Sequence, residues 1–150
     1  MEYKFISQSE SDTIELAENI EGEKFPGMVI CLSGELGSGK TVFTKAFANS
    51  LGITESVTSP TFNIIKEYPN GELPLYHMDV YRVDGNVKEL NLDEYFYGNG
   101  VSIVEWGDMI EDSLPEERLD IIIKVVGEEK RTIILKPHGK KYEDVCEAVL

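Results

Sequence analysis

The sequence predicts an α/β fold, a three-layer sandwich around a mixed, largely parallel sheet with antiparallel additions. Three observations lead to this prediction. The uninterrupted apolar run 28–32 (MVICL) has the length of a strand that is buried on both faces, as strands of parallel sheets are. Apolar residues then recur at helical spacing from Val42 to Leu51, and Gly52 can end that helix. Short strand patterns joined by turn signals predict the antiparallel additions.

The other elements are predicted in chain order from periodicity and turn residues. A helix that ends near Gly22 is expected to begin at Asp12, which forms a capping-box pattern with Glu15. Asn70-Gly71 is a two-residue hairpin signal, so the strands on either side of it should pair antiparallel. No linker or repeat interrupts the chain, which predicts one domain over residues 1–150. The remaining expected elements are strands over 3–6, 62–68, 73–83, 101–104, 119–126 and 131–135, helical turns over 86–97, and a helix over 142–150.

The strongest motif is GELGSGKT at residues 34–41, which fits the phosphate-binding pattern Gly-x-x-x-x-Gly-Lys-Ser/Thr. Its glycines permit positive φ angles, so that successive backbone N–H groups can point at phosphate oxygens. Lys40 is predicted to reach the β- and γ-phosphates, and the Thr41 hydroxyl to hold Mg²⁺. Since a strand precedes the motif and a helix follows it, the sequence predicts a P-loop NTPase domain. The loop residues expected to contact nucleotide are Glu35, Leu36, Gly37, Ser38, Gly39, Lys40 and Thr41.

Two acidic residues are candidates for binding the metal and for orienting the attacking water. Glu105 ends the apolar strand pattern 101–104, the position of a Walker B acid beside Thr41 and the metal; alternatively it is a solvated acid at a strand end. Asp79 lies inside a strand pattern, where a charge is unfavourable unless it is paired or bound to metal. The alternative for Asp79 is a water-facing side chain that pairs with Arg82.

Two further residues have a catalytic and a structural interpretation. Thr61 follows a proline-fixed loop after the phosphate-loop helix, where it either senses the γ-phosphate or closes a turn. Arg82 either stabilises the transition state or forms a salt bridge. Because no residue is clearly built to neutralise the developing charge, we expect slow intrinsic turnover that a partner protein raises. His77 and His138 have no nucleophile beside them and are interpreted as structural. Trp106 is interpreted as a packing residue at the wall of the site, and the alternative is a side chain that stacks on a ligand or partner.

Composition limits the partners and the compartment. The formal charge of −14, from 28 acidic and 14 basic residues, disfavours direct contact with RNA or an anionic membrane. The N-terminal residues resemble neither a signal peptide nor a transit peptide, and no apolar stretch approaches membrane-spanning length, so a cytoplasmic protein is expected. The two cysteines, Cys31 and Cys146, are interpreted as core residues that do not form a disulfide. No zinc-binding spacing occurs.

Motifs and residues that are absent restrict the choice of nucleotide and of reaction. No Asn-Lys-x-Asp occurs, and no Asp-x-x-Gly follows the phosphate loop, so ATP is favoured over GTP. The leading hypothesis is an ATPase that a partner regulates. A small-molecule P-loop kinase should carry an arginine-bearing lid, and the shortage of arginine argues against it. A nucleotide switch that does not hydrolyse ATP is the third possibility.

The motifs together resemble the TsaE (YjeE) family, small bacterial P-loop ATPases of tRNA threonylcarbamoyladenosine formation. The order TSPTF, HMDVYR, VEW is far more specific than the phosphate loop alone. A small departure is Gly107-Asp108, where many members have proline after the tryptophan. The resemblance covers nearly the whole chain through Thr13-x-x-Leu16-Ala17, GELGSGKT at 34–41, TSPTF at 58–62, YHMDVYR at 76–82 and VSIVEWGD at 101–108.

The resemblance implies both a function and a set of site residues. Lys40 and Thr41 would hold phosphate and magnesium, Glu105 would complete the metal site, and Asp79 would be needed for activity. Thr61 would belong to a switch-like loop. The chain would be the ATPase subunit that joins TsaB and the transferase TsaD in modifying position 37 of tRNA, with the tRNA bound by those partners. The family's adenine site would here comprise Glu10, Ser11 and Thr13, with Arg131 from a late strand.

Overall fold

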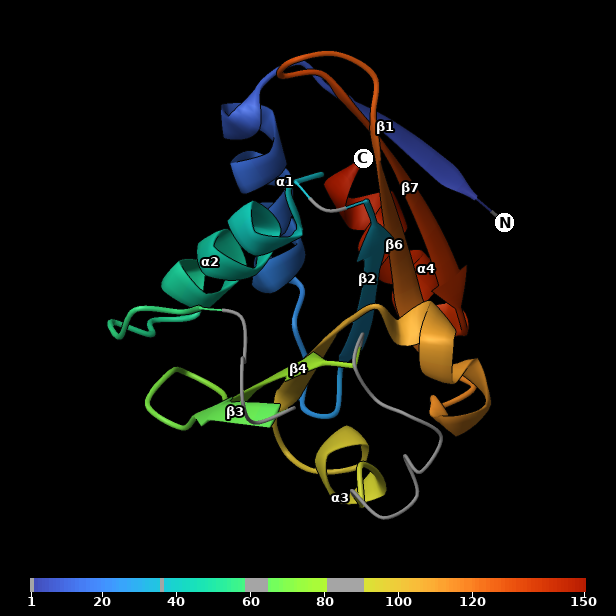
Figure 1. Cartoon of the computed structure of the whole chain (residues 1–150). Helices are drawn as coiled ribbons and strands as arrows, with labels where there is room; N and C mark the ends of the chain where they lie inside the picture. The colour runs from blue at the N-terminus through green and yellow to red at the C-terminus, as the bar shows by residue number, and fades with distance from the viewer. Residues whose placement is uncertain (1, 36, 59–64, 81–90) are drawn as a thin grey trace.

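One seven-stranded mixed sheet runs through the computed structural model, which describes residues 2–35, 37–58, 65–80 and 91–150 (Figure 1). The strand order is β1-β7-β6-β2-β5-β4-β3. In chain order the elements are β1 (Tyr3–Ser7), α1 (Glu10–Gly22), β2 (Val29–Gly34), α2 (Lys40–Ser50), β3 (Ile65–Tyr68), β4 (Leu75–Asp79), α3 (Asp93–Phe96), β5 (Val101–Glu105), the 3₁₀ helix η2 (Gly107–Ser113), β6 (Arg118–Val125), β7 (Arg131–His138) and α4 (Lys140–Val149).

The middle of the sheet is parallel and its edges are antiparallel. β6, β2, β5 and β4 lie side by side in parallel. β7 and β1 add antiparallel strands beyond β6, and β3 adds one beyond β4. The predicted mixed sheet with antiparallel additions is therefore confirmed. Since parallel strands end at the same edge, the loops after β2, β4 and β5 meet there, where α/β folds bind ligands.

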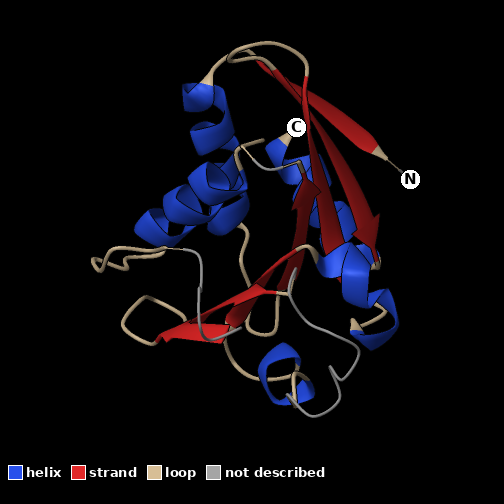
Figure 2. Cartoon of the chain, in the orientation of Figure 1, coloured by secondary structure: helices blue, strands red, loops and turns tan. Residues whose placement is uncertain are grey.

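Helices cover both faces of the sheet, which confirms the three layers (Figure 2). Along β2, Ile30 and Leu32 belong to the core under α1, α2 and α4. The alternate residues Val29 and Cys31 belong to a smaller core with residues of α3 and η2. Alternation along a strand sends successive side chains to opposite faces, and both faces of β2 are buried here. This is why the phosphate-loop strand is a continuous apolar run.

Helix α1 begins earlier than predicted. Its first residue is Glu10 and Ser9 is the N-cap, so Asp12 lies in the first helical turn. The Asp12 carboxylate accepts a hydrogen bond of 2.8 Å from the backbone N–H of Gln8. The predicted capping box from Asp12 to Glu15 is wrong, because Asp12 is not the N-cap and its carboxylate binds the backbone of Gln8, which precedes the helix. The predicted end near Gly22 is confirmed.

The connection between β3 and β4 is longer than a two-residue hairpin. The two strands pair antiparallel as predicted, but Tyr68 is the register partner of Leu75, so residues 69–74 connect them. The Glu72 N–H donates to the Leu51 carbonyl at 2.8 Å, which ties this connection to the end of α2. That contact joins residues far apart in sequence, and the local Asn-Gly signal contains no information about it.

Other boundaries differ by a few residues. Leu73 and Pro74 precede β4, and β7 continues to His138. The 3₁₀ helix η2 was not predicted. The predicted residues 62–64, 81–83 and 86–90 lie outside the described residues.

Both cysteines are buried and free, as expected. Within the described part of the chain, every helix is too short or too polar to cross a membrane.

Candidate functional site

The phosphate loop, residues 34–41, leaves the carboxyl end of β2 with its glycines in conformations that other residues rarely adopt. The φ angles are +150° at Gly34, +78° at Gly37 and +113° at Gly39. The predicted positive φ angles are confirmed. A Cβ atom at Gly34 would lie 2.5 Å from the Ile123 carbonyl oxygen and 2.7 Å from the Ser38 hydroxyl oxygen. Gly34 therefore fixes how closely the loop passes over β6 and turns back on itself.

Lys40 is buried on the inner side of the loop. Its Nζ donates to the carbonyl oxygens of Gly34 at 2.6 Å and Glu35 at 3.0 Å. The same Nζ lies 4.2 Å from the ring centroid of Trp106, close enough for a cation–π interaction. Trp106 has a left-handed backbone with φ 64°, uncommon for a bulky residue. The tryptophan therefore forms a wall of the site, as predicted.

The loop ends in the N-terminus of α2, where unpaired N–H groups and the helix dipole favour an anion. Thr41 is exposed in the first turn of that helix, and Glu35 is exposed in the loop; Leu36 lies outside the described residues. The Ser38 hydroxyl oxygen is buried and has no hydrogen-bond partner in the described part of the chain. A buried hydroxyl without a partner is unfavourable unless a ligand satisfies it. These features fit a bound phosphate group.

The two candidate acids lie side by side where β4 and β5 end. Asp79 and Glu105 are register partners, and Glu105 is also paired with Leu32 of β2. Paired residues of parallel strands send their side chains to the same face, here the face covered by α2. Glu105 is only 3% exposed, so the alternative of a solvated acid is wrong. Asp79 is partly buried, while Arg82, its suggested salt-bridge partner, and the candidate Thr61 lie outside the described residues.

Glu105 has a buried partner that the sequence did not indicate. The Nε2 atom of His77 forms a short hydrogen bond with Oε2 of Glu105. Both side chains are almost fully buried, with 1% and 4% of their areas exposed. His77 precedes Asp79 by two residues on the same strand, so both side chains lie on the same face. The alternation His-x-Asp was the available signal, but it does not show that His77 reaches a neighbouring strand.

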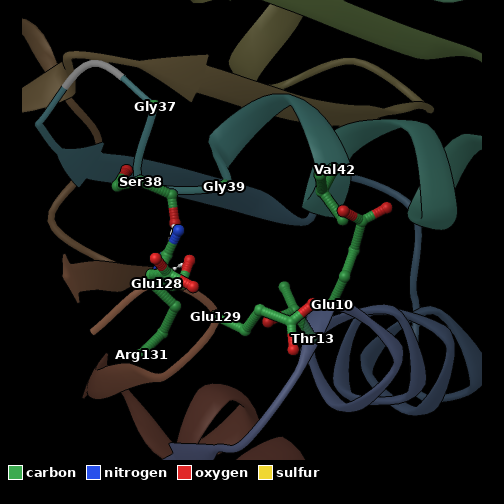
Figure 3. A pocket seen from close by; sticks show the side chains of 9 residues that line it. All are labelled: Glu10, Thr13, Gly37, Ser38, Gly39, Val42, Glu128, Glu129 and Arg131. Atoms are coloured by element: carbon green, nitrogen blue, oxygen red, sulfur yellow. Dashed lines mark hydrogen bonds between the residues drawn. The ribbon is translucent and has the colours of Figure 1, made fainter. Parts of the chain in front are cut away.

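A cavity of about 150 Å³ lies beside the phosphate loop (Figure 3). It includes the turn between β6 and β7, and these strands lie across β2 from β5 and β4, which carry the acids. The predicted adenine-site residues Glu10, Thr13 and Arg131 meet there, although α1 and β7 are far apart in sequence. Ser11 is exposed on α1 and is not among the lining residues. The cavity is lined by Glu10, Thr13, Gly37, Ser38, Gly39, Val42, Glu128, Glu129 and Arg131.

Arg131 joins the turn between β6 and β7 to the phosphate loop. Its Nε donates to the Ser38 carbonyl oxygen at 2.9 Å, one of the contacts drawn in Figure 3. Its Nη1 donates to three carbonyl oxygens of the turn, at Gly127, Glu128 and Lys130. The arginine therefore fixes one wall of the cavity relative to the loop. The strands on either side of this turn were predicted, but the contact of the turn with the phosphate loop was not, so Glu128 and Glu129 were missed. Val42 was predicted only as a helix residue.

The donor set suits a magnesium nucleotide. Within the described ranges, no group of three or more histidine, cysteine or acidic side chains could hold a metal ion by itself. Mg²⁺ usually keeps several waters and takes one or two carboxylates together with substrate phosphates. The Thr41 hydroxyl and the carboxylates of Asp79 and Glu105 at one edge of the sheet are compatible with that requirement.

Comparisons with known proteins give a consistent result. The family model described as "Threonylcarbamoyl adenosine biosynthesis protein TsaE" matches residues 7–133. A Bacillus subtilis protein named tRNA threonylcarbamoyladenosine biosynthesis protein TsaE is 57% identical over 122 residues, 81% of this chain and 77% of the relative. A Treponema pallidum protein of the same name is 38% identical, over 85% of this chain and 96% of its own. The solved structure of Bacillus subtilis YdiB has a TM-score of 0.87 at 47% identity and covers 99% of this chain and 94% of its own.

Proposed function

The chain belongs to the TsaE family, and from this premise we propose that it is an ATP-binding and ATP-hydrolysing subunit of the tRNA threonylcarbamoyladenosine machinery. Relatives that cover most of the chain are named for the biosynthesis of this modified nucleoside, which supports a role in that pathway. One observation carries the enzymatic part of the proposal. Lys40 lies on the inner side of a glycine loop at a helix N-terminus, and two acids in register end the neighbouring parallel strands.

Each residue has a stated role in the proposed reaction. The loop amides, Lys40 and the hydroxyl of Ser38 bind the phosphates, with ATP as the nucleotide. Thr41 and Glu105 hold Mg²⁺, which when bound neutralises charge on the β- and γ-phosphates. Asp79 lies beside Glu105 and either joins the metal site or orients the attacking water. Thr61 belongs to a switch-like loop that senses the γ-phosphate.

The proposal includes slow hydrolysis by the chain alone. The arginines among the described residues are both engaged by the protein itself. Arg118 donates to Asp120 and to the Pro115 carbonyl oxygen, and Arg131 donates to the phosphate loop. Neither of these two is available to neutralise charge that develops in the transition state, and Arg82, the third arginine, lies outside the described residues. We assign stimulation to the partners, a TsaD-type transferase and a TsaB-type subunit.

The charge of the chain supports a division of labour with these partners. With a net charge of −14, it is poorly suited to bind tRNA directly, so the partners would bind the tRNA. A cytoplasmic location is part of the proposal, because the tRNA substrate and its modifying partners are expected there.

Calorimetry and turnover measurements test the proposal together. The wild-type chain should bind ATP in the presence of Mg²⁺, and Lys40→Ala should bind it at least about tenfold more weakly because phosphate contacts are lost. Lys45→Ala, on the exposed face of α2, is the matched control and should bind normally. ATP hydrolysis should be slow for the chain alone and faster after TsaD- and TsaB-type partners are added, with which it should co-purify. Absence of binding heat at saturating ATP would refute the nucleotide site, and binding without hydrolysis in the mixture would indicate a switch.

A further inference from the structure

The buried pair of His77 and Glu105 has a property that the proposed reaction does not yet use. His77 contacts the carboxylate through Nε2, whereas its other ring nitrogen, Nδ1, is buried without a hydrogen-bond partner among the residues that the structure describes. A buried ring N–H without an acceptor is unfavourable, whereas a bare ring nitrogen without a donor is less so. This asymmetry puts a proton on Nε2, so that His77 donates to Oε2 of Glu105.

We propose that His77 is a positioning residue that holds the Glu105 carboxylate in the orientation needed to complete the magnesium site; this inference rests on the proposed function. His77 lies on β4 and Glu105 on β5, so the hydrogen bond crosses between two adjacent parallel strands. It occupies one carboxylate oxygen and thereby fixes the rotation of the group. The second carboxylate oxygen is the one assigned to the metal or its water.

The surroundings of the pair explain why this bond would matter. His77 is the register partner of Ile103, and the same face carries Leu75 and Val101 in the main core. The carboxylate is flanked on this face by apolar side chains, and a carboxylate buried there without a hydrogen bond is strongly disfavoured. Asp79, two residues further along β4, reaches the same edge of the sheet. One short strand segment thus supplies both a second acid and the group that orients the first.

Nuclear magnetic resonance tests the hydrogen bond in the protein without nucleotide or metal. The chain has two histidines, so His138→Gln leaves His77 as the only source of imidazole signals. His138 pairs with Asp120 on β6 and has no part in the proposed site. Long-range ¹H–¹⁵N spectra of this variant should show a proton on Nε2, protected from exchange with water. A spectrum without a proton on Nε2 would overturn the assignment.

Calorimetry then tests the effect on the metal site. His77→Leu keeps a similar volume and removes the donor, so the gain in ATP affinity that Mg²⁺ produces should fall by about tenfold. ATP binding without Mg²⁺ should be unchanged, because the phosphate loop is intact. His77→Gln places an amide nitrogen near the position of Nε2 and should restore the Mg²⁺ effect to within about threefold of wild type.

Two outcomes separate positioning from a purely structural role. If His77→Leu lowers the melting temperature but leaves the Mg²⁺ effect at its wild-type value, the proposal is wrong. If that variant does not fold, His77→Asn replaces it, since its shorter side chain places the amide near Nδ1 and cannot reach Glu105; an unchanged Mg²⁺ effect there would refute the proposal equally. Failure of the wild type to bind ATP would refute the proposed function instead, and the imidazole spectrum would still decide whether His77 donates to Glu105.

Discussion

The two sides of the phosphate loop are built differently. On one side, Glu105 and Asp79 end neighbouring parallel strands, and backbone register places them together. On the other side, the parallel pairing of β6 with β2 brings the turn between β6 and β7 to the loop, and the first turns of α1 complete the cavity from outside the sheet. The acid side is therefore held by the sheet alone, whereas the cavity side also depends on a helix outside the sheet and on individual side chains such as Arg131.

This difference has a functional consequence. Groups that act on the reacting atoms must be held rigidly, and adjacent strands of one sheet do this with many backbone hydrogen bonds. Groups that only recognise the rest of the nucleotide tolerate looser support, because they contribute equally to the ground state and the transition state. Changes on the acid side should therefore alter the catalytic rate, and changes on the cavity side should alter the affinity.

The largest effect is expected from Asp79→Asn on the acid side. The asparagine keeps the size of the side chain but removes the charge beside Glu105, so kcat should fall by about a hundredfold or more. The Kd for ATP should stay within about threefold of wild type, because the phosphate loop is unchanged. Single-turnover hydrolysis and calorimetry measure the two quantities separately. Asp93→Asn, an exposed acid in α3, is the control, and an unchanged kcat in Asp79→Asn would refute the catalytic role.

A smaller and opposite pattern is expected from Arg131→Lys on the cavity side. Lysine keeps the positive charge but cannot donate to the Ser38 carbonyl oxygen and to the turn together. Without this hydrogen bond the cavity wall must be ordered when ATP binds, which predicts an ATP affinity about tenfold weaker with little change in kcat. Lys130→Arg makes the reverse change at the exposed neighbouring residue and should behave as wild type. If Arg131→Lys lowered kcat and left Kd unchanged, the two sides would not differ as proposed.

The same contrast explains how much of the molecule the sequence predicts. The apolar run of β2, the glycines after it and the acid that ends β5 are local patterns, and the structure places all three at one edge of the sheet. These three features meet because parallel strands end at the same edge of a sheet, so the periodicity of the sequence was sufficient to predict their proximity. Trp106 was placed at the site wall for the same reason, because it directly follows Glu105.

Features that depend on contacts between distant segments could not be predicted this way. Arg131, Glu10 and Thr13 were assigned to the site only through the family resemblance, and Glu128 and Glu129 were not assigned at all. No periodic pattern indicates that the turn after β6 folds back onto Ser38, 93 positions earlier than Arg131. The prediction of a two-residue turn between β3 and β4 was wrong for the same reason, since a hydrogen bond from this connection to the end of α2 overrides the local turn signal.

The smallest effect on nucleotide is expected from α4, which supplies none of the residues that line the cavity or end β4 and β5 and therefore serves as a reference. Burial raises the pKa of the Cys146 thiol from 9.0 to about 11, so folding favours the protonated thiol. The resulting stabilisation is complete below pH 9.0 and is lost as the pH rises towards about 11. The free energy of unfolding of the wild type should therefore decline across this range, by at most about 2 kcal/mol from this group.

Replacing Cys146 should remove that decline without changing the site. Cys146→Ala should be less stable than wild type near neutral pH because a buried side chain is shortened, but its free energy of unfolding should change less with pH. Urea unfolding at about pH 8 and about pH 10 measures this difference. Val145→Ala removes a comparable buried group from the same helix and should keep the wild-type pH dependence. Parallel declines in the two variants would contradict the assignment to Cys146, and a change in ATP affinity in either would show that α4 is coupled to the site.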